Sequence, residues 1–112
     1  MDKPFALIVE DDRDTAALFR HVMDLVGFRT ETIFHGQVAI ERLSNSHPDL
    51  VLLDLNLPGV SGGQILEMIR KDERLTPTKV VVVTGYPHVA SSLSAQPDLV
   101  LQKPVSIDQL TS

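Results

Sequence analysis

Short apolar runs separated by helical patterns are the feature that most constrains the fold of this chain. Consecutive apolar residues over four to six positions are typical of strands buried on both faces of a parallel sheet. Runs of this kind cover Phe5–Val9, Asp49–Asp54 and Val80–Val83, and a shorter one covers Leu99–Leu101. A weaker strand is expected over Glu31–Phe34. With 112 residues, the chain is long enough for one domain with one core.

Helical periodicity fills the intervals between these runs. The first helix is expected to have one apolar face, made by Leu18, Val22, Leu25 and Val26. Asp12 or Asp14 is the candidate cap at its start, and Gly27 is suited to end it. Further helices are expected around Ala39–Leu43, around Ile65–Ile69, between Pro87 and Pro97, and from Ser106 to the last residue.

Alternation of strands and helices predicts an α/β fold. The expected architecture is a flavodoxin-like, doubly wound, five-stranded parallel sheet of order 2-1-3-4-5. We expect residues 1–112 to form a single domain whose last helix is truncated at Ser112. Ligands of such sheets bind at the carboxyl ends of the strands, where the order reverses between the first and third strands.

Acidic residues follow both strands at that point. Glu10, Asp11 and Asp12 come directly after the first strand, and Asp54 ends the third. Carboxylates gathered at one edge repel one another, which raises their pKa values or calls for a cation. Mg²⁺ suits a site made of a few carboxylates and several waters.

A hydroxyl and an ammonium group end the remaining strands. Thr84 follows the fourth strand and Lys103 follows the fifth, so both are expected beside Asp54. A carboxylate nucleophile, a metal site and donors for phosphoryl oxygens together form a set suited to phosphoryl transfer.

Charge and composition exclude several other functions. The net charge of −5 disfavours nonspecific binding to nucleic acid or to an anionic membrane. The absence of cysteine excludes disulfides and thiolate zinc sites. No apolar run approaches the roughly 20 residues that span a bilayer, and the first residues do not resemble a signal peptide. These features predict a cytoplasmic protein.

The motifs taken together resemble the receiver domain of two-component response regulators, over essentially the whole chain. The motifs are Leu7–Asp12, Leu52–Gly62 with its Asp-x-x-x-Pro-x-x-x-Gly pattern, Val82–Gly85, and the dipeptide Lys103-Pro104. This resemblance implies a phosphoacceptor module of a phosphorelay rather than an enzyme, because its only chemistry is its own phosphorylation and dephosphorylation. It implies a sensor histidine kinase or phosphotransfer protein as partner, is compatible with a homodimer, and leaves the output open.

The resemblance also implies roles for the acidic residues. Asp54 matches the phosphoacceptor, which would take a phosphoryl group from a phosphohistidine. Asp11 matches the direct ligand of Mg²⁺, and Glu10 matches the acid that holds the ion through water. Asn56 matches the position that binds the ion through its backbone carbonyl. Asp12 is better explained as the cap of the first helix.

Further roles implied by the resemblance concern the other strand ends. Thr84 matches the hydroxyl that bonds the phosphoryl group, and Lys103 matches the lysine that pairs with its oxygens. The Lys103–Pro104 bond is expected to be cis, which costs little before proline. Gly85 is small enough to let the phosphoryl group enter, and Tyr86 is expected to shield the acyl phosphate from water.

Two departures from the family pattern concern the readout of phosphorylation. Relatives carry Tyr or Phe three residues before the lysine, where this chain has Val100. The segment from Thr84 to Lys103 is also a few residues shorter than usual. These differences predict that the chemistry survives while the usual readout changes.

Three alternative functions share part of this pattern. An aspartyl-phosphate-forming phosphatase of the haloacid-dehalogenase type also uses an Asp at a strand end, but it needs a second Asp where this chain has Asn56. A degenerate receiver that acts only as an interaction module would lack phosphorylation. A flavodoxin would need a Ser/Thr/Gly-rich phosphate loop in place of the acids after the first strand.

Overall fold

A computed structural model describes residues 3–103 of the chain. The predicted cis bond between Lys103 and Pro104 and the predicted helix from Ser106 lie outside the described residues.

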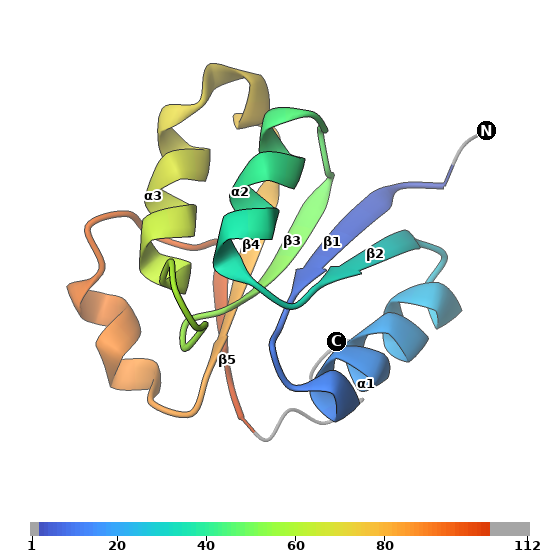
Figure 1. Cartoon of the computed structure of the whole chain (residues 1–112), viewed down its shortest axis with the longest axis horizontal. Helices are drawn as coiled ribbons and strands as arrows, with labels where there is room; N and C mark the ends of the chain where they lie inside the picture. Colours follow the sequence, from blue (N-terminus) through green and yellow to red (C-terminus); the bar gives the residue numbers. More distant parts are fainter. Residues whose placement is uncertain (1–2, 104–112) are drawn as a thin grey trace.

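The described residues form a parallel five-stranded sheet of order β2-β1-β3-β4-β5, as predicted (Figure 1). The strands are β1 (Phe5–Val9), β2 (Arg29–Ile33), β3 (Leu50–Asp54), β4 (Lys79–Thr84) and β5 (Leu99–Gln102). The weaker strand was expected to start two residues later and to end one residue later than β2, because its polar residues blur the alternation pattern. In the register of β1 and β3, Val9 lies opposite Leu53, so the residues after both strands meet at one edge.

Helices cover both faces of the sheet (Figure 1). Helix α1 (Arg13–Leu25) lies on one face, and α2 (Gly36–Ser44) and α3 (Gly62–Lys71) lie on the other. Two short 3-10 helices, η1 (Glu73–Leu75) and η2 (Pro87–Ser92), precede β4 and β5. The observed architecture is therefore the predicted doubly wound, flavodoxin-like α/β fold.

Alternate residues of the central strands supply two separate cores. Leu7, Val9 and Leu53 face α2 and α3, while Ala6 and Ile8 face α1. Every residue of β1 is buried. Because side chains alternate across a strand, a continuous apolar run is what a strand covered on both faces requires.

The apolar face of α1 differs in part from the predicted one. Val22 is buried as expected, but Leu25 is 68% exposed and Val26 is 46% exposed. The buried stripe is centred on Phe19, so Leu25 falls at the side of the helix, and Val26 follows the last helical residue. The start agrees with the prediction, since the Asp12 side chain accepts a hydrogen bond from the Asp14 amide at 3.1 Å.

The helix expected between Pro87 and Pro97 is the 3-10 helix η2 and not an α-helix. Prolines at both limits and a serine-rich sequence between them favour this outcome. The residues after η2 are held against α3 by polar contacts. Ser94 Oγ donates to Glu67 Oε2 at 2.9 Å, and Arg70 Nη2 lies 2.8 Å from Asp98 Oδ2.

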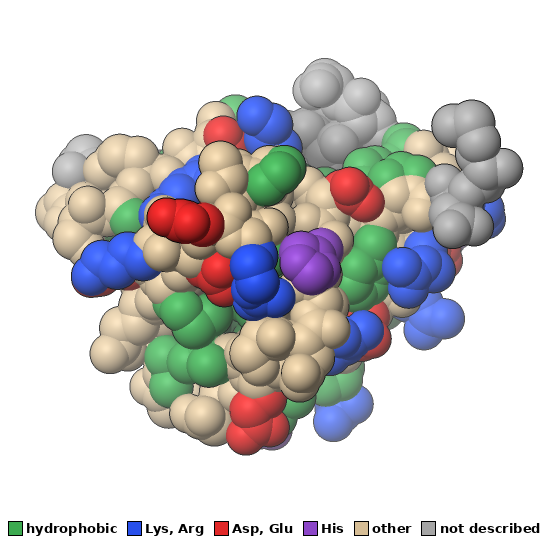
Figure 2. Space-filling view, turned by 90° about the horizontal axis from the view of Figure 1, so that it is seen from above, with side chains coloured by type: hydrophobic (Ala, Val, Ile, Leu, Met, Phe, Trp, Pro, Cys, Tyr) green, Lys and Arg blue, Asp and Glu red, His purple; other side chains and the backbone are tan. Residues whose placement is uncertain are grey.

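The end of the molecule where the strands begin lies opposite the predicted site. Acidic and basic side chains are interspersed on this face, with scattered apolar ones between them (Figure 2). Within residues 3–103, none of the helices combines the length and apolar character needed to cross a membrane.

Candidate functional site

Three carboxylates meet at the carboxyl edge of the sheet, where β1 and β3 end. Glu10, Asp11 and Asp54 each present an oxygen within 4.8 Å of the others. Glu10 is fully buried and Asp54 is 2% exposed, whereas Asp11 is exposed. The Glu10 amide donates to the Ile33 carbonyl at 2.9 Å, which continues the sheet pairing and fixes the backbone at this point.

Lys103 joins the carboxylates from the end of β5. Its Nζ lies 2.8 Å from Glu10 Oε1 and 3.3 Å from Asp54 Oδ2. The Lys103 amide donates to the Thr84 carbonyl at 2.9 Å, which holds the lysine at the edge of the sheet. The Lys103 ammonium thus connects the ends of β1, β3 and β5.

The surroundings give the two buried carboxyl groups different pKa values. Burial, reinforced by the neighbouring Asp54, raises the pKa of Glu10 to about 8 although Lys103 opposes the change. Burial would also raise the pKa of Asp54, but hydrogen bonds from Glu10 and the Asn56 amide, with the charge of Lys103, hold it below its ordinary value. Asp54 is therefore ionised at neutral pH, as a nucleophile must be.

Thr84 and Asn56 lie at the same edge. Thr84 ends β4 and is 2% exposed, and its Oγ1 accepts a hydrogen bond from the Tyr86 amide at 3.1 Å. Because the hydroxyl accepts this bond, its own proton is available for another acceptor. The Asn56 amide donates to Asp54 Oδ1 at 3.0 Å, which orients the Asp54 carboxylate.

The donor set fits a hard divalent cation. Glu10 Oε1 is buried and accepts no well-aligned hydrogen bond from any residue of the described chain, although the Lys103 ammonium is close. Lys103 is the one cationic group of the described residues beside this oxygen, and three acidic groups crowd the same edge. A bound divalent cation would compensate the charge that Lys103 alone leaves. Together with Asp11 and Asp54, Glu10 offers the oxygen ligands that Mg²⁺ prefers.

The structure therefore brings the predicted site residues to one edge of the sheet. Glu10, Asp11, Asp54 and Lys103 form one cluster, and Thr84 and Asn56 border it. An added Cβ at Gly85 would meet nothing within 4 Å, and Tyr86 is 63% exposed. Val100 packs against the core on the α3 side.

Sequence reasoning missed one residue that shapes the site. A Cβ at Gly62 would clash with the Asp54 carbonyl oxygen and lie 2.7 Å from Leu55 Cα. The start of α3 therefore packs directly on the backbone of Asp54. The Gly62-Gly63 pair at the helix start was a visible signal, but only the fold reveals what it contacts.

Comparison with known proteins identifies the family that this fold and site define. The sequence matches the family described as "Response regulator receiver domain" over residues 6–112, and the chain belongs to this family. Receiver domains are signalling modules of response regulators.

Individual relatives agree with this assignment. The chain is 35% identical over 80 residues to the polar-differentiation response regulator DivK of Brucella ovis, a match that covers 71% of this chain and 65% of DivK. It is 32% identical over 108 residues to the regulatory protein AtoC of Escherichia coli K12, a match that covers 93% of this chain and 23% of AtoC. The chain thus spans less than two thirds of these relatives.

Solved structures show the same fold. A CheY-like response regulator receiver domain from Methylobacillus flagellatus superimposes with a TM-score of 0.83 at 31% identity, covering 97% of this chain and 93% of that one. The chemotaxis response regulator CheY4 of Vibrio cholerae gives a TM-score of 0.85 at 19% identity, covering 97% of this chain and 93% of that one, which supports the fold alone.

Proposed function

We propose that this receiver domain is a phosphoacceptor and that Asp54 carries the phosphoryl group. The observation that supports this most strongly is the convergence of three carboxylates and the Lys103 ammonium at the carboxyl edge of the sheet. An ionised Asp54 oriented by the Asn56 amide is the nucleophile that such a step requires.

The proposed donor is a phosphohistidine of a sensor histidine kinase or phosphotransfer protein. An Asp54 oxygen attacks the phosphorus, so that a P–O bond forms while the P–N bond to the imidazole breaks. The imidazole nitrogen keeps the electron pair of the broken bond. The product is an acyl phosphate, which water later hydrolyses to regenerate the Asp54 carboxylate.

Glu10, Asp11, Asp54 and the backbone carbonyl of Asn56 are the proposed ligands of Mg²⁺. Once bound, the ion would neutralise charge on the transferring phosphoryl oxygens. Because burial raises the pKa of Glu10 to about 8, we expect binding of the cation to release a proton from this carboxyl at neutral pH.

Lys103 and Thr84 are the proposed partners of the phosphoryl group after transfer. Lys103 Nζ already lies 3.3 Å from Asp54 Oδ2, so an oxygen added there falls within reach of the ammonium. The buried Thr84 hydroxyl has a proton to donate at the same edge. Phosphorylation then shifts an existing inactive–active equilibrium by favouring the state in which both contacts form.

Intact-mass measurement after incubation with acetyl phosphate tests this function. We expect the chain to gain one phosphoryl group in the presence of Mg²⁺ and none in the presence of EDTA. Asp54→Asn should abolish the gain. Asp14→Asn removes the same charge in the first turn of α1 and serves as the matched control, which should react like the unaltered chain.

Two results would contradict the proposal. No adduct on a chain shown to bind Mg²⁺ would favour a module that signals without phosphorylation. Sustained turnover of a phosphate ester with release of product would favour the phosphatase.

A further inference from the structure

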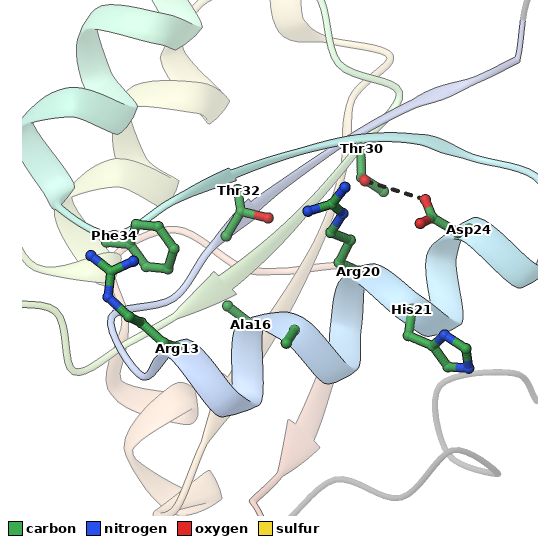
Figure 3. Close-up of a pocket in the computed structure, with 9 residues that line it drawn as sticks. Arg13, Ala16, Arg20, His21, Asp24, Thr30, Thr32 and Phe34 are labelled. Carbon is green, nitrogen blue, oxygen red and sulfur yellow. Dashed lines mark hydrogen bonds between the residues drawn. The ribbon is translucent and has the colours of Figure 1, made fainter.

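A groove lined by basic side chains runs between α1 and the edge strand β2 (Figure 3). Its larger part has a volume of about 710 Å³ and a second part continues it past Arg20, Asp24 and Thr30. The charged residues that line the two parts are Lys3, Arg13, Arg20, Arg29 and Asp24. The Arg29 guanidinium lies over the Phe5 ring on the opposite face of the sheet, so three basic groups and one acidic group face the groove. In a chain whose net charge is −5, the groove therefore differs in sign from the molecule as a whole.

Strand β2 has an unpaired edge along this groove. It is the terminal strand of the sheet and pairs only with β1 among the described elements. The Arg29 amide bonds to the Pro4 carbonyl and the Ile33 carbonyl accepts from Glu10, so these alternate residues point their backbone groups at β1. The backbone groups of Thr30 and Thr32 consequently point away from β1, to the outer edge.

The side chains beside this edge are arranged to receive anionic groups. Arg20 extends from α1 toward Thr30 and Thr32, whereas His21 points away from the strand (Figure 3). The Arg13 guanidinium carbon lies 4.3 Å from the centre of the Phe34 ring, a cation–π contact that places its charge at one end of the groove. Arg20 is exposed and forms no ion pair within residues 3–103, so its charge can meet a ligand without breaking one.

We propose that the groove is a docking site for an acidic segment of a partner protein, bound in extended conformation along the outer edge of β2. Backbone hydrogen bonds to Thr30 and Thr32 would add a strand to the sheet. Carboxylates at every second position of the segment would face α1 and meet Arg13 and Arg20. The site is separate from Asp54, which lies two strands away in the sheet.

The charge of the groove decides between occupants. A second copy of this chain pairing through its own β2 edge would bring Arg13 and Arg20 against their equivalents, and such like charges repel. A small anion would need the arginines but would leave the backbone of β2 unpaired. An acidic strand uses both the charges and the open edge.

Nuclear magnetic resonance titration with a synthetic probe tests this proposal. The probe is a capped peptide of about six residues that alternates Glu and Val, a length typical of strands. We expect it to shift the amide signals of Thr30, Thr32 and Phe34, with binding that weakens as salt is added. A peptide with Lys in place of Glu, and one with N-methylated backbone, should cause no such shifts.

Two charge reversals, one inside the groove and one outside it, test whether the charge of the groove binds the peptide. Arg20→Glu should weaken binding of the acidic peptide at least about tenfold. Lys71→Glu makes the same change in charge on α3, at a side chain that is 74% exposed, and should leave binding within about twofold.

Several results would overturn the proposal. These are no shift at β2 with the acidic peptide, equal binding of the Lys or N-methylated peptide, and an Arg20→Glu variant that binds as well as the unaltered chain. Inorganic phosphate that reproduces the same shifts at equal affinity would identify a small-anion site instead.

Discussion

Two stretches at the same edge of the sheet supply the candidate site, and they are held in different ways. The ends of β1 and β3 carry Glu10 and Asp54, and they are fixed by strands that are buried almost throughout. The stretch from Thr84 to Lys103 contains a short 3-10 helix and the strand β5, which has no fully buried residue.

This difference separates the residues proposed to carry out phosphorylation from those proposed to respond to it. The carboxylates are positioned by apolar packing on both faces of the central strands. The other stretch is only half-buried against the cores, and polar contacts add to its hold, in which Arg70 bonds to the Gln96 carbonyl at 3.0 Å and pairs with Asp98. We therefore expect changes in the first stretch to alter the site and changes in the second to alter how the site responds.

The largest expected effect is a pH dependence that arises in the first stretch. The pKa of Glu10 is 4.5 in an ordinary setting and about 8 in the folded chain. Between these values, rising pH ionises Glu10 in the unfolded chain first, so the free energy of unfolding should fall and then level off above about pH 8. Urea unfolding in EDTA measures this slope.

Glu10→Gln is the variant that isolates the effect. It should remove the slope, while the histidines contribute equally to both chains and cancel in the difference. The lowered pKa of Asp54 and the raised pKa of Lys103 act below pH 4 and above pH 10, outside this window. Added Mg²⁺ should reduce the slope of the unaltered chain, and identical slopes for the two chains would contradict the interpretation.

Two neighbouring glycines allow the two stretches to be compared directly. Gly62 faces the backbone at Asp54, whereas an added Cβ at Gly63 would lie 3.1 Å from Leu93 Cδ2, a flexible side chain after η2. Gly62→Ala should cost about 2 kcal/mol because backbone must shift and should slow phosphorylation. Gly63→Ala should stay within about 0.5 kcal/mol, since the gain in helix propensity offsets a small movement of Leu93. Equal costs in denaturant unfolding would show that the two stretches are equally rigid.

Arg70→Ala removes two polar contacts of the second stretch and one contact with the turn before β4. Arg70 bonds the Thr78 and Gln96 carbonyls and pairs with Asp98, so its loss should cost about 1 kcal/mol. Amide hydrogen exchange should accelerate between residues 93 and 98 and stay unchanged in β1 and β3. Lys71→Ala, which removes one exposed pair with Glu67, is the control and should have little effect. Faster amide exchange in β1 and β3 as well would contradict the distinction between the two stretches.

The smallest expected effect concerns Tyr86, beside the site. Tyr86 is 63% exposed and follows Thr84 by two positions. If it shields the acyl phosphate, Tyr86→Ala should speed dephosphorylation a few-fold without changing the phosphorylation rate. Intact mass measured over time gives the dephosphorylation rate. An unchanged rate would show that Tyr86 does not shield the acyl phosphate.

The sequence predicted what depends on local pattern. Strand order and the gathering of Glu10, Asp54 and Lys103 follow from buried runs and from the residues that end them. The exposure of Leu25 could not be predicted, because it depends on which side of α1 the sheet covers. The prolines and serines around η2 argue against an α-helix, but they do not by themselves specify a 3-10 helix. Contacts between distant residues, such as Gly62 against the backbone of Asp54, become visible only in the fold.

Localising the phosphoryl group tests the proposed role of Asp54 most directly. The chain is phosphorylated with acetyl phosphate and Mg²⁺, and the acyl phosphate is then reduced with borohydride, which converts the modified aspartate into homoserine. Tandem mass spectrometry of the peptides should find homoserine at position 54 and unaltered Asp11. Homoserine at Asp11 or at another acidic residue, with Asp54 intact, would contradict the proposed site.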